Sequence, residues 1–392
     1  FKTVYSFGAT QWNSRYPSRG LTSDSAGNVY GTAYAGGNFQ QGTVFVWSSA
    51  GVETDIYSFS SMVGDGIYPK AGVALDKNGN LFGTTTSGGA TGYGTIYELT
   101  PTDGSYTAKV LYSFCSLANC ADGSATNASL SVGANGDLYG TTPNGGLGAA
   151  GQDNGIIFRL RPPRGQQTSW TETVLHAFCS QPACSDGANP NGAPLLAKDG
   201  FLYGTASGGG QGGGVIYRVK PSGADFQVMH AFLNDGEDGF YPLTSLAVDK
   251  ENVLYGTTAL GGTGTGSDGL GTVFSYDPKS STYSKIYDFH GSDGEGPQSG
   301  LTIVETKKTK IFYGTLSGAG GPGYGAVYSL SPPAKQSDPW TAQVLHAFCS
   351  KKNCKDGLDL FEVKLANVGG AIYGTAGGGG TYGAAVIFRA RN

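Results

Sequence analysis

The chain has few charged residues and no long apolar run. Only 14% of its 392 residues are Asp, Glu, Lys or Arg, and the formal net charge is −4. Because no cluster of Lys and Arg offers a surface for a phosphate backbone, we expect no nucleic-acid partner. No apolar run approaches the roughly 20 residues that cross a bilayer, so we expect no membrane span.

Several catalytic motifs are absent as well. The sequence contains no G-x-S-x-G nucleophile elbow, no P-loop and no H-E-x-x-H. These absences argue against the common serine hydrolases, P-loop nucleotide hydrolases and zinc peptidases. The many G-x-G stretches reflect loop composition and are not nucleotide-binding fingerprints.

Glycine and aromatic residues are abundant instead. The chain holds 67 Gly, 23 Tyr and 19 Phe. The glycines do not follow a Gly-X-Y order, which excludes collagen, and a disordered linker would not carry so many aromatic rings. This composition is typical of an all-β repeat protein.

One motif recurs along the whole chain: an aromatic residue, then glycine, then threonine. Seven copies lie 52 to 64 residues apart, and they begin at Tyr30, Phe82, Tyr139, Tyr203, Tyr255, Tyr313 and Tyr373. Around the second copy the pattern predicts four strands, a to d, at 72–76, 81–85, 94–99 and 108–114. A period of this size indicates a propeller or an array.

The two ends of the sequence complement each other. The chain opens inside a strand d at Phe1, with no signal peptide before it, so we expect a processed start. It ends at Asn392, after a strand c. The first strand therefore completes the last blade and protects both edges. We predict an all-β fold: a closed seven-bladed β-propeller with four strands per blade, forming one domain over residues 1–392.

The six cysteines form three C-x4-C pairs at equivalent repeat positions: Cys115 and Cys120, Cys179 and Cys184, Cys349 and Cys354. We interpret them as three short-range disulfides. A zinc site is the alternative, but it needs about four converging ligands. Disulfides imply an oxidising compartment, so we expect a secreted protein.

The combined pattern resembles the GloVer tandem repeat of secreted proteins from soil and aquatic bacteria. The residues that carry the resemblance are Leu-Tyr-Gly-Thr-Thr, Gly-Thr-Val-Phe, a strand ending Tyr-Ser-Phe, Cys-x4-Cys and Asp-Gly, and they cover essentially the whole chain. The resemblance implies export but no general catalytic residue set. The strand order is also similar to NHL-type propellers, some of whose distant relatives are lyases or lactonases, which is an analogy of fold alone.

We expect any ligand site on the face where the d–a and b–c loops emerge, because these loops are long and variable. The first d–a loop departs most from the repeat. Trp12 and Tyr16 are suited to stack on a sugar, and Arg15 and Arg19 to pair with a carboxylate. Adjustment of this loop to the ring-closure seam is the competing interpretation.

Other candidates are departures from the repeat in later loops. Glu237, Asp238, Phe240 and Tyr241 lie in the fourth-blade loop, and Asp153 and Asp268 in long b–c loops. His290 is the one histidine outside a repeated slot, which makes it the best general-base candidate, with Glu295 nearby in the same loop. Strand a of blade seven carries Asp359 and Glu362.

Features shared by all blades are more readily explained by structure. His176, His230 and His346 fill a strand-d slot that is tyrosine in the other blades, which indicates packing between blades. A recurrent Asp-Gly indicates a turn in which Asp caps backbone N–H groups. These residues are Asp65, Asp122, Asp186, Asp235, Asp293 and Asp356. We expect no cofactor, with Ca²⁺ bound by these loops as an alternative.

Three functions remain open from the sequence. The first is a secreted propeller that binds an extracellular carbohydrate. The second is an extracellular polysaccharide lyase or glycoside hydrolase that uses His290, Arg15 and Glu295. The third is a structural or surface-assembly protein. Neither the ligand nor the oligomeric state follows from the sequence.

Overall fold

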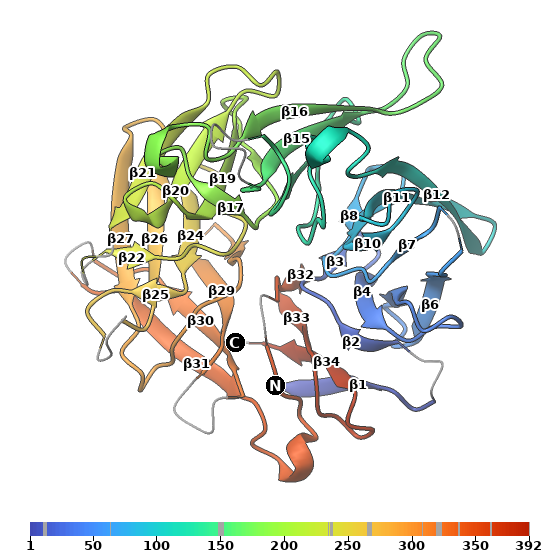
Figure 1. The fold of residues 1–392 in the computed structure, drawn as a ribbon. Coiled ribbons are helices and arrows are strands. Elements are labelled where there is room, and N and C mark those ends of the chain that lie inside the picture. The colour runs from blue at the N-terminus through green and yellow to red at the C-terminus, as the bar shows by residue number, and fades with distance from the viewer. Residues whose placement is uncertain are drawn as a thin grey trace.

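The computed structural model shows seven antiparallel sheets arranged as blades around a central axis (Figure 1). It describes residues 1–10, 14–62, 64–147, 153–233, 235, 238–264, 269–307, 309–318, 324–335, 338–360 and 363–391. In each blade strand a lies nearest the axis and strand d lies at the rim. The predicted all-β propeller with seven four-stranded blades is confirmed.

The first three blades follow the chain in the order a to d. Blade one contains β3 (Thr22–Ser23), β4 (Val29–Ala35), β5 (Thr43–Trp47) and β6 (Glu53–Ser58). Blade two contains β8 (Ala74–Leu75), β9 (Leu81–Thr85), β11 (Thr95–Thr102) and β12 (Ser105–Ser113). Blade three contains β13 (Ser131–Val132), β14 (Leu138–Thr142), β15 (Ile156–Arg161) and β16 (Thr171–Ala177).

The last four blades repeat this order. Blade four contains β18 (Leu195–Leu196), β19 (Leu202–Gly208), β20 (Gly212–Val219) and β21 (Gln227–Leu233). Blade five contains β23 (Ala247–Val248), β24 (Leu254–Thr258), β26 (Thr272–Asp277) and β27 (Thr282–Asp288). Blade six contains β28 (Thr302–Glu305), β29 (Lys310–Leu316), β30 (Ala326–Ser331) and β31 (Thr341–Ala347). Blade seven contains β32 (Ala366–Val368), β33 (Ala371–Ala376), β34 (Ala385–Ala390) and β1 (Lys2–Phe7).

The N-terminal strand closes the ring as predicted. β1 pairs antiparallel with β34, from Lys2 opposite Arg389 to Phe7 opposite Ala385, and Figure 1 shows the blue strand beside the red one. The Tyr5 hydroxyl donates to Glu53 of blade one at 2.8 Å. The pairing of β1 with β34 therefore closes the ring within blade seven, and the Tyr5 bond holds β1 against blade one.

The glycine of the repeated motif lies beneath the aromatic ring of strand c. At Gly140, an added Cβ would lie 2.4 Å from Cζ of Phe158 and 2.9 Å from Leu130. In each of the other blades the equivalent aromatic ring of strand c lies over the motif glycine, at Gly31, Gly83, Gly204, Gly256, Gly314 and Gly374. Because a contact that short leaves no room for a side chain, the motif requires glycine at each copy.

In five of its seven copies, the threonine of the motif connects neighbouring blades, whereas the hydroxyls of Thr315 and Thr375 are buried without a hydrogen-bond partner. Its hydroxyl donates to a backbone carbonyl just before strand a of the next blade, for example from Thr141 to Gly192 at 3.1 Å. The same bond joins Thr32 to Ala71, Thr84 to Ala128, Thr205 to Thr244 and Thr257 to Ser299. The motif therefore serves architecture, since it joins strands within a blade and blades to one another.

The strand-d slot packs against the next blade, as predicted. Each slot histidine lies flat on an aromatic ring of the following strand d, with ring centroids 3.5 to 3.7 Å apart. The stacked pairs are His176 with Phe226, His230 with Tyr283, and His346 with Phe1. In the four blades whose slot residue is tyrosine, the position of the next blade that faces the slot carries Glu53, Ala108, Glu172 or Ala342, as the strand registers show.

Glu172 is a half-buried acid at one of these facing positions. Its Oε1 is buried and has no hydrogen-bond partner. Burial raises the pKa of Glu172 to about 8, and the charge of Asp122 adds to the increase. The side chain therefore holds a proton at neutral pH in the folded protein, where a free carboxyl would have lost it.

Replacing Gly140 by Ala should destabilise the propeller by about 1–3 kcal/mol, because the new Cβ overlaps the Phe158 ring. Chemical denaturation measures the loss. Gly208 is the matched control, because its added Cβ would meet nothing nearer than 3.5 Å. In the double variant Gly140→Ala with Phe158→Leu, the smaller side chain should recover part of the stability. Equal losses at Gly140 and Gly208 would contradict this explanation of the motif.

Replacing Glu172 by Gln should raise the melting temperature at high pH and have little effect at low pH. The pKa of a glutamate carboxyl is about 4.3 in the unfolded state and about 8 for Glu172 in the folded state. Such a group stabilises the fold fully below about pH 4.3, and this contribution is lost as the pH rises to about 8. We expect a gain of roughly 1–3 kcal/mol at pH 9 that vanishes near pH 4. Asp103→Asn, in the exposed turn between β11 and β12, is the control. A gain independent of pH would refute the shifted pKa.

Candidate functional site

The d–a and b–c loops emerge on one face of the ring, as predicted, and they pair with each other there. In blade two, β7 (Gly66–Ile67) pairs with β10 (Ser87–Gly88). In blade five, β22 (Gly239–Phe240) pairs with β25 (Leu260–Gly261). Corresponding single bridges or short ladders occur in the other blades. Backbone pairing therefore holds each d–a loop to the b–c loop of the blade that it leads into.

An aspartate in each of six d–a loops anchors the loop to the slot residue of strand d. Asp186 accepts a hydrogen bond from His176 at 3.0 Å and from the backbone N–H of Ser180 at 3.0 Å. Asp122 does the same with Tyr112 at 2.7 Å and Ser116 at 2.8 Å. The predicted capping role of the Asp-Gly aspartates is thus observed, and their carboxylates are already engaged.

In blade four the sequence interpretation selected the wrong aspartate. His230 bonds to Asp238 at 2.9 Å, and Tyr283 donates to the same carboxylate at 2.7 Å. The strand pairing decides between the two Asp-Gly steps: Gly239 pairs with Gly261 of the b–c loop, where an added Cβ would overlap Thr258, so the aspartate directly before it is the loop anchor. Asp238 is therefore part of the loop anchor, whereas Asp235 accepts from the Asp238 backbone at 2.9 Å.

The three predicted disulfides are present and lie in the same loops. Cys115–Cys120, Cys179–Cys184 and Cys349–Cys354 each close a short loop that contains one 3-10 turn, Ala118–Cys120, Pro182–Cys184 or Lys352–Cys354. The cross-links therefore stiffen the loops that leave blades two, three and six.

In each d–a loop, one residue follows directly after the position that pairs with the b–c loop. These seven residues form a ring around the mouth of the channel, which we call the mouth ring. Its members are equivalent by strand pairing, and all have a positive φ between 52° and 66°: Tyr16, Tyr68, Ala125, Asn189, Tyr241, Gly296 and Asp359. Non-glycine residues adopt this conformation rarely, and such strain is common at binding sites. Two predicted ligand-binding residues, Tyr16 and Tyr241, occupy equivalent places in this ring, and 54% and 47% of their surfaces are exposed.

A groove of about 320 Å³ lies at the mouth where blades one, two and seven meet. It is lined by Tyr16, Pro17, Ser18, Arg19, Tyr34, Lys70, Asp359, Val363 and Gly377. Tyr34 stacks on Tyr68 with ring centroids 4.8 Å apart, and Nζ of Lys70 lies 5.4 Å from the Tyr34 centroid. Desolvation raises the pKa of Asp359. The groove combines aromatic faces with both cationic and acidic groups.

Below the groove, a cavity of about 110 Å³ occupies the central channel. Its lining comes from all seven blades and includes Arg19, which also lines the groove, and Lys364. The groove and the cavity therefore meet at Arg19.

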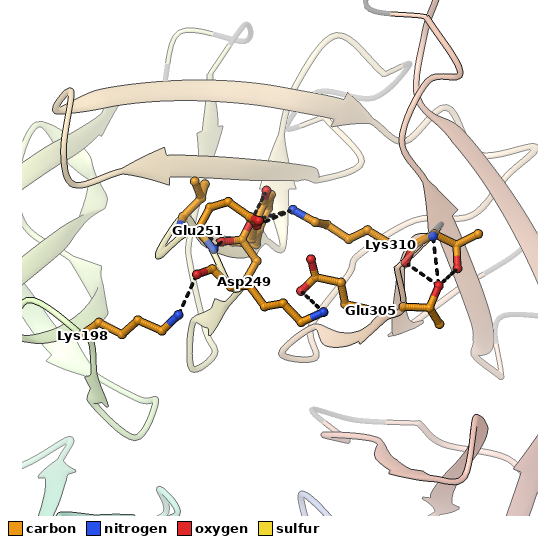
Figure 2. Close-up of polar contacts among 10 residues, drawn as sticks. Lys198, Asp249, Glu251, Glu305 and Lys310 are labelled. Carbon is orange, nitrogen blue, oxygen red and sulfur yellow. Dashed lines mark hydrogen bonds and ion pairs between the residues drawn. The ribbon is translucent and has the colours of Figure 1, made fainter.

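The charges on the opposite face neutralise one another. Figure 2 shows Lys310 directed at Asp249, with Nζ 2.7 Å from Oδ2. Lys250 forms an ion pair with Glu305 at 3.8 Å. Burial alone would raise the pKa of Asp249, but hydrogen bonds from Lys310 and its neighbours outweigh burial and lower it. This network links blades four to six at the a–b turns and has the character of structural support.

The remaining candidates do not join the groove. His290 and Glu295 are exposed in the loop that leads into blade six, and Nδ1 of His290 lies 3.9 Å from Asp293. Arg15 is part of β2 (Arg15–Pro17) at the start of blade one, so the structure does not bring the three together in one lining. Phe240 is half-buried against the blade-five core. Asp153 accepts a hydrogen bond from the Gly145 backbone.

Four candidates, Trp12, Glu237, Asp268 and Glu362, lie outside the described residues. Within the described part, no three His, Cys, Asp or Glu side chains gather in a way that could hold a metal ion. No helix there is long and apolar enough to cross a membrane.

Sequence reasoning missed Tyr34, Lys70 and Lys364 in and below the groove. Tyr34 follows a motif copy, while Lys70 and Lys364 precede strand a. A column-by-column alignment of the seven repeats would have marked Tyr34 and Lys70, because the other blades carry mostly small or neutral residues there. Lys364 falls into its column only once the strand pairing is known.

Sequence reasoning also missed an acidic pair beneath the first d–a loop. Burial and the neighbouring Asp55 raise the pKa of Glu53 to about 7. Burial raises the pKa of Asp55 as well, against a hydrogen bond from Ser14. The pair supports the loop from below and lines neither the groove nor the cavity.

The fold has counterparts among solved structures. The GH74 xyloglucanase of Xanthomonas campestris matches with a TM-score of 0.56 at 12% identity, over 100% of this chain and 53% of that chain. A GH74 enzyme of Niastella koreensis gives 0.53 at 14% identity, over 88% and 47%. A puromycin hydrolase mutant gives 0.56 at 13% identity, over 95% and 53%. The chain spans about half the length of these proteins, and such identities show a shared fold alone.

A search of the curated proteins found no match to the chain. The model of the Gloeobacter/Verrucomicrobia repeat, in contrast, matches residues 1–182 and 148–388, which together cover nearly the whole sequence. This match agrees with the repeated motif, the loop anchors and the seven blades, so the chain belongs to the Gloeobacter/Verrucomicrobia repeat family.

Proposed function

We propose that this protein is a secreted β-propeller that binds an extracellular glycan on the face formed by the d–a and b–c loops. The observation that carries the proposal is the groove at blades one, two and seven. Tyr16 is half exposed at its rim, and Tyr34 lies within it against Tyr68.

The chemistry of the groove suits a sugar. The flat apolar face of a pyranose packs on an aromatic ring, while its hydroxyls need donors and acceptors at the edge. Tyr16 and Tyr34 supply the rings, and Arg19, Lys70 and Asp359 supply the polar edge. A nucleic-acid ligand would instead need many cations, and the whole chain has a net charge of −4.

Two further points support an extracellular carbohydrate ligand. The three disulfides fit an oxidising compartment and hence secretion. One of the solved structures that share the fold is named a xyloglucanase, which is a carbohydrate-active protein. That likeness is one of fold, so the groove residues carry the proposal.

Replacing Tyr16 by Asn should weaken glycan binding about tenfold, or about 1.4 kcal/mol, because a stacking face is lost. Asparagine tolerates the left-handed backbone at this position, so the loop should keep its shape. The assay is affinity electrophoresis in gels cast with plant and microbial polysaccharides. Tyr241→Asn is the matched control, because Tyr241 has the same backbone conformation in the mouth ring but lies outside the groove.

Equal retardation of wild type and Tyr16→Asn would contradict the groove as the site, and no retardation in any gel would contradict glycan binding. Clearing of the polysaccharide around the band would favour the alternative, a lyase or glycoside hydrolase, and His290→Gln would then test the general base. Large polymers in solution would favour a surface-assembly protein.

A further inference from the structure

One position of the central channel breaks the seven-fold pattern. In each blade, one residue of strand a pairs with the aromatic residue of the repeated motif. We define the channel ring as the seven residues, one from each blade, that lie two positions before that strand-a residue. Six of its members are small and neutral: Gly20, Gly72, Ser129, Ala193, Ser245 and Gly300. The seventh is Lys364, the one member of this ring with a long, cationic side chain.

Blade one packs closely against the backbone and the Cβ of this lysine. The backbone N–H of Leu21 donates to the carbonyl of Lys364 at 3.1 Å, which fixes its Cα beside blade one. Gly20 faces it directly, and a Cβ added at Gly20 would lie 3.2 Å from the Cβ of Lys364. A side chain at Gly20 would therefore crowd the stem of the lysine.

Among the described residues, no hydrogen bond or ion pair joins the Lys364 ammonium to another group. Water reaches the side chain through the channel, yet protein from all seven blades surrounds it, and this desolvation lowers the pKa of Lys364. A cation in such a place costs stability unless a counter-charge compensates it.

The lining of the cavity favours an anion. Seventeen described residues line it; two of them, Arg19 and Lys364, are cationic and none is acidic. Ser129 and Ser245 add hydroxyls, which can donate hydrogen bonds to an anion. The cavity of about 110 Å³ has room for several water molecules, or for one small charged substituent in their place.

The geometry points to an anion site in the channel, and we propose that Lys364, with Arg19 above it, binds the carboxylate of an acidic glycan held in the groove. This inference rests on the proposed function, and it narrows the ligand class to glycans that carry uronic acids. Arg19 lines both the groove and the cavity. A sugar stacked on Tyr16 and Tyr34 in the groove would therefore direct its charged substituent into the cavity. A sulfated glycan shares this chemistry, and the experiment separates the two.

The first experiment is calorimetric titration with trigalacturonate, with its fully methyl-esterified form and with a sulfated galactan oligosaccharide. We expect trigalacturonate to bind at least tenfold tighter than the ester. Lys364→Gln should remove most of this preference and leave the affinity for the ester unchanged. Lys198→Gln removes the same charge from the opposite face (Figure 2) and should leave the preference intact.

Equal affinities for acid and ester, or a preference that survives Lys364→Gln, would overturn the channel site while leaving glycan binding in place. A stronger preference for the sulfated oligosaccharide would overturn the assignment to carboxylates. Thermal melting of each variant shows whether it is folded.

The second experiment tests the site on the wild-type protein and does not require groove binding. Lysines are labelled by reductive ¹³C-methylation, and the Lys364 resonance is assigned by its loss in Lys364→Gln. Addition of free galacturonate should shift this resonance and raise the pKa of the amine, because a bound anion stabilises its charged form. Galactose, which lacks the carboxylate, should do neither. A Lys364 resonance that responds to neither sugar would overturn the proposal even if the protein binds polysaccharide.

Discussion

The close contact between a glycine on strand b and an aromatic ring on strand c is the constraint on which the rest of the propeller depends. It occurs seven times, and in each copy a Cβ would come within 2.7 Å of the ring. The ring fills the space that a side chain would occupy, so strand c packs flat on strand b at the middle of the blade. In five copies the adjacent threonine also bonds to the next blade. One tripeptide therefore sets both the packing within a blade and the spacing between blades.

Because this constraint is local and repeated, the sequence was sufficient to predict the fold. The motif, the short a–b turns and the offset of the first strand predicted seven blades and their closure, and strand b at 81–85 matches β9 (Leu81–Thr85). Strand a was predicted too long, since only Ala74–Leu75 pairs there. The apolar pattern continues beyond the two paired residues, so hydropathy alone does not mark where the pairing begins.

The site was only partly predictable, for two physical reasons. Its side chains come from separate segments, and a loop motif such as Tyr16 to Arg19 shows one wall of the groove but not Tyr34 or Lys70 opposite it. The register also changes in blade seven: seven positions separate Arg15 from Thr22, whereas eight separate the equivalent Leu358 from Ala366. An alignment without the strand pairing therefore moves Lys364 out of its column. A similar ambiguity, two Asp-Gly steps in one loop, led to Asp235 in place of Asp238.

The groove lies beside the one place where the ring is not continuous in the chain, and the lysine of the cavity comes from the same blade. Blade seven is completed by β1, and the seam is joined by the pairing of β1 with β34 and by the backbone bond between Leu21 and Lys364. Tyr16 and Arg19 belong to one side of this seam, and Asp359 and Lys364 to the other. A ligand that contacts both sides binds only the closed ring, so its binding free energy also opposes opening at the seam. The departures from seven-fold repetition are thus concentrated where the fold itself gains most from an additional contact.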